Sequence, residues 1–307
     1  MHRDPEESGK RVASDLDLEA KAFDDRIKER EDEGFIPDLR RLRSNHYFYK
    51  SFWREPEYVD LYLGKLLRMY VSSIDTLVGP SAKILDAGCG PGYFSLELAR
   101  HGHHVCGVDI SGGAVRAAIG ARDSGDPALM TGSLDYLVVS PLDLGTEFSG
   151  RFDAILSSGF LHHVPNLDPM VEKLHSLLRP DGILVLHEPQ HASFTNRDAF
   201  FVLAMRMILA ASELWYDEEM KSARYEDLSV LTRAVHREFV LERDPHETGQ
   251  SPNDLSADRA DIVHALSAHF EEIEIRESSA FIYRTLGGLR GDRDVLQVVA
   301  ELVARIG

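Results

Sequence analysis

The stretch Ile84-Leu85-Asp86-Ala87-Gly88-Cys89-Gly90-Pro91-Gly92-Tyr93-Phe94-Ser95 decides the fold. It reads as a short apolar strand, a turn with three glycines at alternate positions, and a helix that continues to Arg100. Glycine has no Cβ atom, so a strand-to-helix turn of this kind lets the backbone come close to a ligand. The stretch therefore predicts a ligand-binding loop at the end of a buried strand.

From Lys83 to Glu188, short apolar runs alternate with amphipathic segments long enough to form helices. Strands are predicted at residues 83–87, 104–109, 137–139, 152–157 and 182–187. Segment 168–178 has a proline in its first turn and one apolar face, which is typical of a helix. Such an alternation predicts a mostly parallel sheet with helices on both faces and with ligands at the carboxyl ends of its strands.

The alternation stops after Glu188 and resumes near the end of the chain. Residues 272–277 and 280–284 are predicted as two more strands, and residues 292–306 as a last helix. The predicted fold class is therefore α/β, a Rossmann-like seven-stranded sheet with an N-terminal helical extension and a helical insertion between strands 5 and 6. The predicted segments are a charged leader (1–44), an aromatic helical lid (45–79), the ligand-binding core (80–191), a helical cap insertion (192–268) and the final strands and helix (269–307).

Charge and cysteine content narrow the class of partner. The chain of 307 residues is 43% hydrophobic and carries 51 acidic and 34 basic residues, a net charge of −17. A field of that sign repels phosphate backbones and anionic lipids, so no nucleic acid and no membrane is expected as partner. Cys89 and Cys106 make neither a disulfide framework nor a zinc-ligand pattern, and the N-terminus resembles no signal peptide. A cytoplasmic location is expected.

Two acids near the glycine loop narrow the choice of cofactor. Asp109 ends the second strand, 109 − 88 = 21 residues after Gly88, where a carboxylate can accept hydrogen bonds from both hydroxyls of a ribose. A dinucleotide loop requires a small residue at the position of Tyr93, and Asp86 repels a pyrophosphate. These features weigh against a nicotinamide-dependent dehydrogenase. They favour a nucleoside cofactor with a cationic group.

Residues 80–190 resemble the class I S-adenosylmethionine-dependent methyltransferases of the small-molecule type. The resemblance rests on three motifs in order, at residues 86–109, 152–164 and 177–182. It implies that the glycines lie against the methionine and ribose parts of S-adenosylmethionine, that Asp86 meets the amino group, and that Asp109 holds the ribose. Asp143 is the only candidate for an acid at the adenine and fits a surface position equally well. The implied cofactor-binding residues are Asp86, Gly88, Gly90, Gly92, Asp109, Ile110, Asp143 and Ser158.

Candidate catalytic residues follow the fourth and fifth strands. His162 and His163 lie just beyond the fourth strand. Glu188 ends the fifth, where it fits a role in acceptor binding or, alternatively, a helix cap or a loop contact. Methyl transfer is an in-line displacement that mainly needs alignment, but an alcohol or phenol acceptor also needs a base, for which histidine is suited near neutral pH. The alternative role for either histidine is a packing contact within its loop. Aromatic side chains that fit a sulfonium or an acceptor, or alternatively the core, are Tyr47, Tyr49, Trp53 and Tyr93.

Residues 187–191 match the zinc-protease pattern H-E-x-x-H. That site needs both histidines on one face of a helix, whereas residues 183–186 read as a strand and Pro189 would break a helix. No metal is therefore predicted.

The predicted function is S-adenosylmethionine-dependent methylation of a small molecule, with an oxygen acceptor favoured and nitrogen or carbon open. Secondary metabolism, or sugar or quinone modification, is the expected setting. The alternative is an enzyme of the same fold that binds the cofactor and catalyses a rearrangement or elimination without methyl transfer. The apolar residues 199–211 and the aromatic segment near Tyr47 fit either a lid or a homodimer interface.

Overall fold

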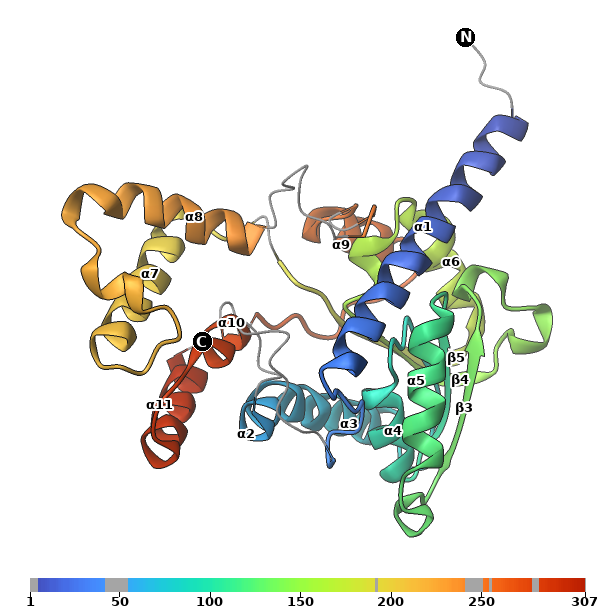
Figure 1. Cartoon of the computed structure of the whole chain (residues 1–307). Helices are drawn as coiled ribbons and strands as arrows, with labels where there is room; N and C mark the ends of the chain where they lie inside the picture. Colours follow the sequence, from blue (N-terminus) through green and yellow to red (C-terminus); the bar gives the residue numbers. More distant parts are fainter. Residues whose placement is uncertain are drawn as a thin grey trace.

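The computed structural model describes residues 5–41, 55–190, 193–240, 251–253, 256–277 and 282–306. Its centre is a parallel sheet with the strand order β3-β2-β1-β4-β5 (Figure 1). The strands are β1 (Lys83–Ala87), β2 (His104–Asp109), β3 (Ser133–Val138), β4 (Phe152–Ser158) and β5 (Leu178–His187). The order reverses direction between β1 and β4, which places the ligand-binding edge at the carboxyl ends of these two strands.

Helices cover both faces of the sheet because the central strands are apolar on both sides. Ile84 and Leu85 are neighbours in β1, both are fully buried, and they belong to separate hydrophobic clusters on opposite faces. The first face is covered by α3 (Lys65–Leu77), α4 (Tyr93–Arg100) and α5 (Gly112–Asp123), and the second by α6 (Leu167–Leu177) and α9 (Arg259–Ser267). This arrangement confirms the predicted α/β class and the two-sided parallel sheet.

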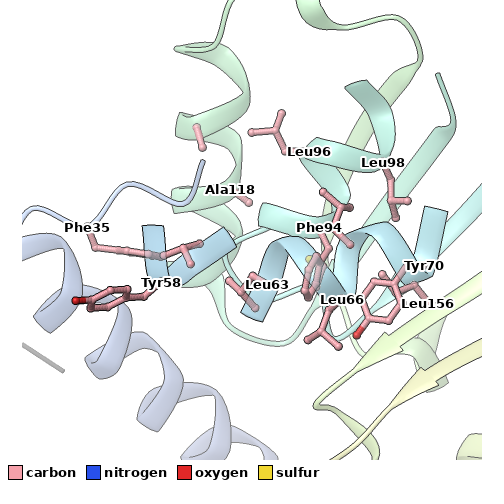
Figure 2. Close-up of a cluster of buried hydrophobic side chains, with 14 of the residues drawn as sticks. Phe35, Tyr58, Leu63, Leu66, Tyr70, Phe94, Leu96, Leu98, Ala118 and Leu156 are labelled. Atoms are coloured by element: carbon pink, nitrogen blue, oxygen red, sulfur yellow. The ribbon is translucent and has the colours of Figure 1, made fainter. Parts of the chain in front are cut away.

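The first face is packed by aromatic and leucine side chains. Figure 2 shows Leu66 and Tyr70 of α3 beside Phe94 of α4 and Leu156 of β4. The Tyr70 and Phe94 rings meet edge to face at 5.1 Å. α3 continues α2 (Pro56–Val59) through one π-helical turn at Asp60–Gly64, so the predicted helix in this region is confirmed. Tyr58 and Tyr70 are core residues.

A second group of helices follows β5, and lies at the left of Figure 1. α7 (Asn196–Ala211) packs against α8 (Leu228–Val240), with the Phe194 and Phe239 rings stacked at 4.4 Å. α10 (Ile282–Gly288) and α11 (Arg293–Ile306) lie beside them. No helix among the described residues is long and apolar enough to cross a bilayer.

The two additional strands predicted near the end of the chain are not formed in the described part. Residues 271–277 have no strand partner, and Ile282–Gly288 is a helix where a strand was predicted. Ile273 and Ile275, which create the alternating pattern, are 70% and 46% exposed and reach no core. The described residues therefore form a five-stranded sheet, while residues 278–281 lie outside the described ranges.

Two further expectations need correction. β3 begins at Ser133, before the predicted residues 137–139, because Leu134 and Tyr136 supply its buried side chains and Val138 is exposed. The N-terminal segment was expected to be a charged leader, but α1 (Pro5–Asp32) is a helix with a buried face that includes Glu19 and Ile27. α1 therefore packs on the core.

Candidate cofactor and acceptor site

The glycine loop joins β1 to α4 in a left-handed backbone conformation. Gly88, Gly90 and Gly92 have φ angles of +72°, +52° and +79°. A Cβ atom at Gly88 would lie 2.6 Å from the Phe160 ring, and one at Gly92 would overlap Tyr136 and Ala118. A Cβ atom at Gly90 would meet nothing within 4 Å. Gly88 and Gly92 thus permit close packing, whereas Gly90 borders open space that a ligand can enter.

Asp86 lies in β1 directly below this loop. Its side chain is 2% exposed, and Oδ2 accepts a hydrogen bond from the Ser95 hydroxyl at 2.5 Å. Burial raises the pKa of Asp86 to about 7, the Ser95 hydroxyl opposes the rise, and the charge of Asp109 adds to it. A cation beside this buried carboxyl group would stabilise its ionised form.

Asp109 links the glycine loop to the turn before α5. The Gly90 N–H donates to its Oδ2 at 2.9 Å, and the Ser111 N–H donates to its Oδ1 at 2.8 Å. Burial raises the pKa of Asp109 although both N–H groups oppose the rise. Each carboxylate oxygen has a second lone pair, so Asp109 can also accept hydrogen bonds from two hydroxyls of a ligand.

The turn after β4 is fixed by Glu188. Glu188 Oε1 accepts hydrogen bonds from the N–H groups of Phe160 (3.0 Å) and Leu161 (2.8 Å). Glu188 Oε2 lies 2.6 Å from His162 Nδ1, and each of the two side chains is 9% exposed. A carboxylate only accepts, so Nδ1 carries the proton and Nε2 is the nitrogen with the lone pair. Glu188 therefore sets the tautomer and orientation of His162.

The second histidine of the pair turns to other partners. His163 Nδ1 lies 3.0 Å from Ser251 Oγ and 3.1 Å from Glu19 Oε1. Its ring packs against the His162 ring with centroids 4.0 Å apart. The two histidines are thus close in space but have different carboxylate partners.

The other predicted residues lie in several places. Ser158 ends β4, and its hydroxyl lies 3.0 Å from the Tyr70 hydroxyl. Tyr93 begins α4 and packs edge-on against Phe94, Ile110 directly follows Asp109 and is half-buried, and Asp143 is exposed on the turn after β3. Tyr47, Tyr49 and Trp53 lie outside the described residues, as does His191 of the H-E-x-x-H pattern. His187 lies on a strand, and no group of described side chains has the arrangement of a metal site.

An open groove of about 1830 Å³ runs beside β5 and reaches Glu188. Tyr62 of the π-helical turn and Met69 and Tyr70 of α3 line one wall, and residues 271–277 line the other. The groove brings a space large enough for an organic acceptor to the residue that holds His162.

Several residues of this site were not predicted from the sequence. They are Tyr70, which meets Ser158, and the contacts of Glu19, Asp24, Ser111 and Ser251. The sequence did contain evidence that one face of α1 is buried. Residues at helical spacing share that face: Glu19, Phe23, Ile27 and Arg30. The high charge of the segment concealed it.

Comparison with known proteins gives a consistent result. The family model of the methyltransferase domain matches residues 62–237, more than half of the chain. The ubiquinone biosynthesis O-methyltransferase of Xanthomonas axonopodis pv. citri is 34% identical over 137 residues, 44% of this chain and 52% of that protein. The protein of the same name from Chromobacterium violaceum is 34% identical over 101 residues, 33% of this chain and 41% of that protein. The chain thus spans about half the length, or less, of these curated relatives.

Among solved structures, a methyltransferase from Methanosarcina mazei is similar with 24% identity and a TM-score of 0.38, over 54% of this chain and 83% of that one. The family match covers the glycine loop, both acids and the turn after β4. The chain belongs to the methyltransferase-domain family, within the class I S-adenosylmethionine-dependent methyltransferases.

Proposed function

We propose that this protein transfers a methyl group from S-adenosylmethionine to an oxygen atom of a small organic acceptor, with His162 as the general base. The observation that carries the proposal is the His162–Glu188 pair, 2.6 Å apart at the carboxyl end of β4. The relatives named as O-methyltransferases of ubiquinone biosynthesis support an oxygen acceptor.

The residues present fit the cofactor of this family. Gly90 borders open space, and Asp109 beside it has lone pairs for the ribose hydroxyls. Asp86 supplies a buried carboxylate near the loop, where a positively charged ligand is stabilised. When bound, the cofactor supplies an electrophilic methyl group on a sulfonium.

The chain's own contribution is to place the acceptor and accept its proton. His162 Nε2 would accept the proton that the acceptor hydroxyl loses when its oxygen takes the methyl group that bound S-adenosylmethionine would supply. Glu188 stabilises the imidazolium that results, because it already accepts from Nδ1. Both side chains are nearly buried, so the proton transfer takes place away from bulk water.

The acceptor class follows from the groove beside β5. Its wall carries Tyr62, Met69 and Tyr70 together with Ile183 and Leu186, and Glu188 lies at its edge. The groove also carries charged side chains, among them Lys65, Arg68, Arg259 and the four glutamates of residues 271–277. Its aromatic and aliphatic part suits a flat ring, and its charged part suits a polar substituent such as an ionisable hydroxyl. We therefore propose a phenol or catechol as acceptor, and the predicted cap at residues 192–268 as the element that closes on it.

The test measures S-adenosylhomocysteine and labelled methyl product with a panel of phenols, catechols, amines and carbon acids. His162→Gln should lower kcat by about 100- to 10,000-fold and leave the Kd for S-adenosylmethionine unchanged. His264→Gln, the same substitution at an exposed position of α9, is the matched control and should retain the turnover of the wild type. Label on nitrogen or carbon, or full activity of His162→Gln, would refute the proposal.

A further inference from the structure

α1 lies along α5 (Figure 1), and its side chains contact the turns that follow β2 and β4. Ile27 packs against Ala114 and Ala117 of α5. The segment was expected to be a charged leader, yet the polar contacts of its buried face are made at the carboxyl edge of the sheet. That edge is where a ligand binds in an open α/β sheet.

The first contact is made by Asp24 at the turn after β2. Its Oδ1 accepts hydrogen bonds from the Ser111 hydroxyl at 2.5 Å and from the Gly113 N–H at 2.7 Å. The N–H of the same Ser111 donates to Asp109. Asp24 thus fixes the turn that orients the proposed ribose-binding carboxylate.

The second contact is made by Glu19 at the turn after β4. Glu19 is 2% exposed, its Oε1 lies 3.1 Å from His163 Nδ1, and its Oε2 accepts from the Asn253 N–H at 2.9 Å. Burial alone would raise the pKa of Glu19, but His163, Ser251 and Asn253 lower it overall. Glu19 therefore joins three distant segments, which are α1, the turn of the two histidines and residues 251–253.

The positive charge of Arg30, near the end of α1, opposes the rise that burial causes in the pKa of Tyr93, to about 12. α1 therefore contacts the turns after β4 and β2, and the charge of Arg30 acts on the first residue of α4.

We propose that α1 forms the outer wall of the cofactor site, with Glu19 and Asp24 as positioning residues, and that cofactor exchange requires the Glu19 end to leave the turn after β4. The two ends are held differently. The far end is anchored by Ile27 and by buried Phe35, whereas Glu19 is held by polar partners that water can replace. The inference rests on the proposed function only through cofactor binding.

The test is the dissociation rate of S-adenosylhomocysteine from the full-length protein, measured by stopped-flow competition. Glu19→Gln should dissociate about tenfold faster, the change expected when one buried charged contact is lost. Glu31→Gln, the same substitution at an exposed position of α1, is the matched control and should match the wild type.

Hydrogen exchange of the wild-type chain provides a second readout that needs no variant. Amides of residues 15–32 should gain protection when S-adenosylhomocysteine binds. Unchanged dissociation in Glu19→Gln, or unchanged protection of these amides, would overturn the inference alone. A wild-type protein that binds neither adenosyl ligand would overturn the proposed function as well.

Discussion

The segment from β1 to β5 and the helices that follow it hold their polar groups in different ways. In the first, functional carboxylates are held by nearby backbone: Asp109 accepts from the N–H groups of Gly90 and Ser111. In the second, α7 is held to α8 by a side-chain pair, buried Arg206 with Glu238 at 2.8 Å. Backbone donors are fixed by local turns, whereas side-chain pairs depend on which distant segments meet. A motif can therefore predict the first kind of contact and not the second.

The largest expected effect concerns a side-chain pair that joins α4, within the β1–β5 segment, to the distant segment after α1. Arg100 is 2% exposed and binds Asp38 at 2.8 Å as well as Glu97, so it joins the segment after α1 to α4. Arg100→Met should lower the free energy of unfolding by about 3–5 kcal/mol, because it leaves a buried carboxylate without its partner. Urea unfolding measures the loss.

The matched control for Arg100 is an arginine on the surface. Arg179 pairs with Asp153 at 2.9 Å but is 47% exposed, so Arg179→Met should cost less than about 1 kcal/mol. Equal losses in the two variants would mean that the buried ion pairs of Arg100 with Asp38 and Glu97 are no stronger than a surface pair.

The same distinction explains how far the sequence could predict the molecule. The strand at residues 83–87 was predicted at its observed bounds. Glu188 and His162 were placed by the sequence at one edge of the sheet, and the structure adds a direct contact between them that was not predicted. The strand and the shared edge depend on local periodicity and on the rule that parallel strands end at one edge. The contacts of Glu19 could not be predicted from the sequence because its partners are distant along the chain. His163 lies 163 − 19 = 144 residues away, and Asn253 lies 234 residues away.

The second prediction concerns Asp109, the carboxylate proposed to bind the ribose of the cofactor. Asp109→Ala removes the acceptor for the ribose hydroxyls and should raise the Kd for S-adenosylmethionine at least about 100-fold, as expected for two hydrogen bonds to a charged group. Titration calorimetry measures the change. Asp135→Ala, at an exposed position of β3, should bind as the wild type does. A Kd unaffected by Asp109→Ala would place the ribose elsewhere.

The third prediction uses the pH dependence of Asp86. Because burial raises its pKa from 3.8 to about 7, Asp86 contributes stability to the ligand-free protein that is fully present below pH about 4 and is lost as pH rises through about 7. A cationic ligand prefers the carboxylate form. The Kd for S-adenosylmethionine should therefore fall about tenfold between pH 6 and pH 8, with release of a proton on binding.

Calorimetry in buffers of different ionisation enthalpy would detect that proton. Asp86→Asn has nothing to release, so its binding should be weaker at pH 8 and nearly independent of pH. Should Asp86→Asn retain the wild-type pH dependence, the proton would come from another group.

The smallest expected effect concerns residues 272–277, which follow the helical region after β5. The alternation at residues 272–277 predicted a strand, yet Ile273 is 70% exposed and the segment pairs with none of the described strands. Ile273→Asp should therefore change the free energy of unfolding by less than about 0.5 kcal/mol. Leu156→Ala, in β4 and fully buried, should cost about 2–5 kcal/mol. A loss above about 1 kcal/mol in Ile273→Asp would mean that this isoleucine packs in a core, as a strand beside β5 requires, and that periodicity was the better guide here.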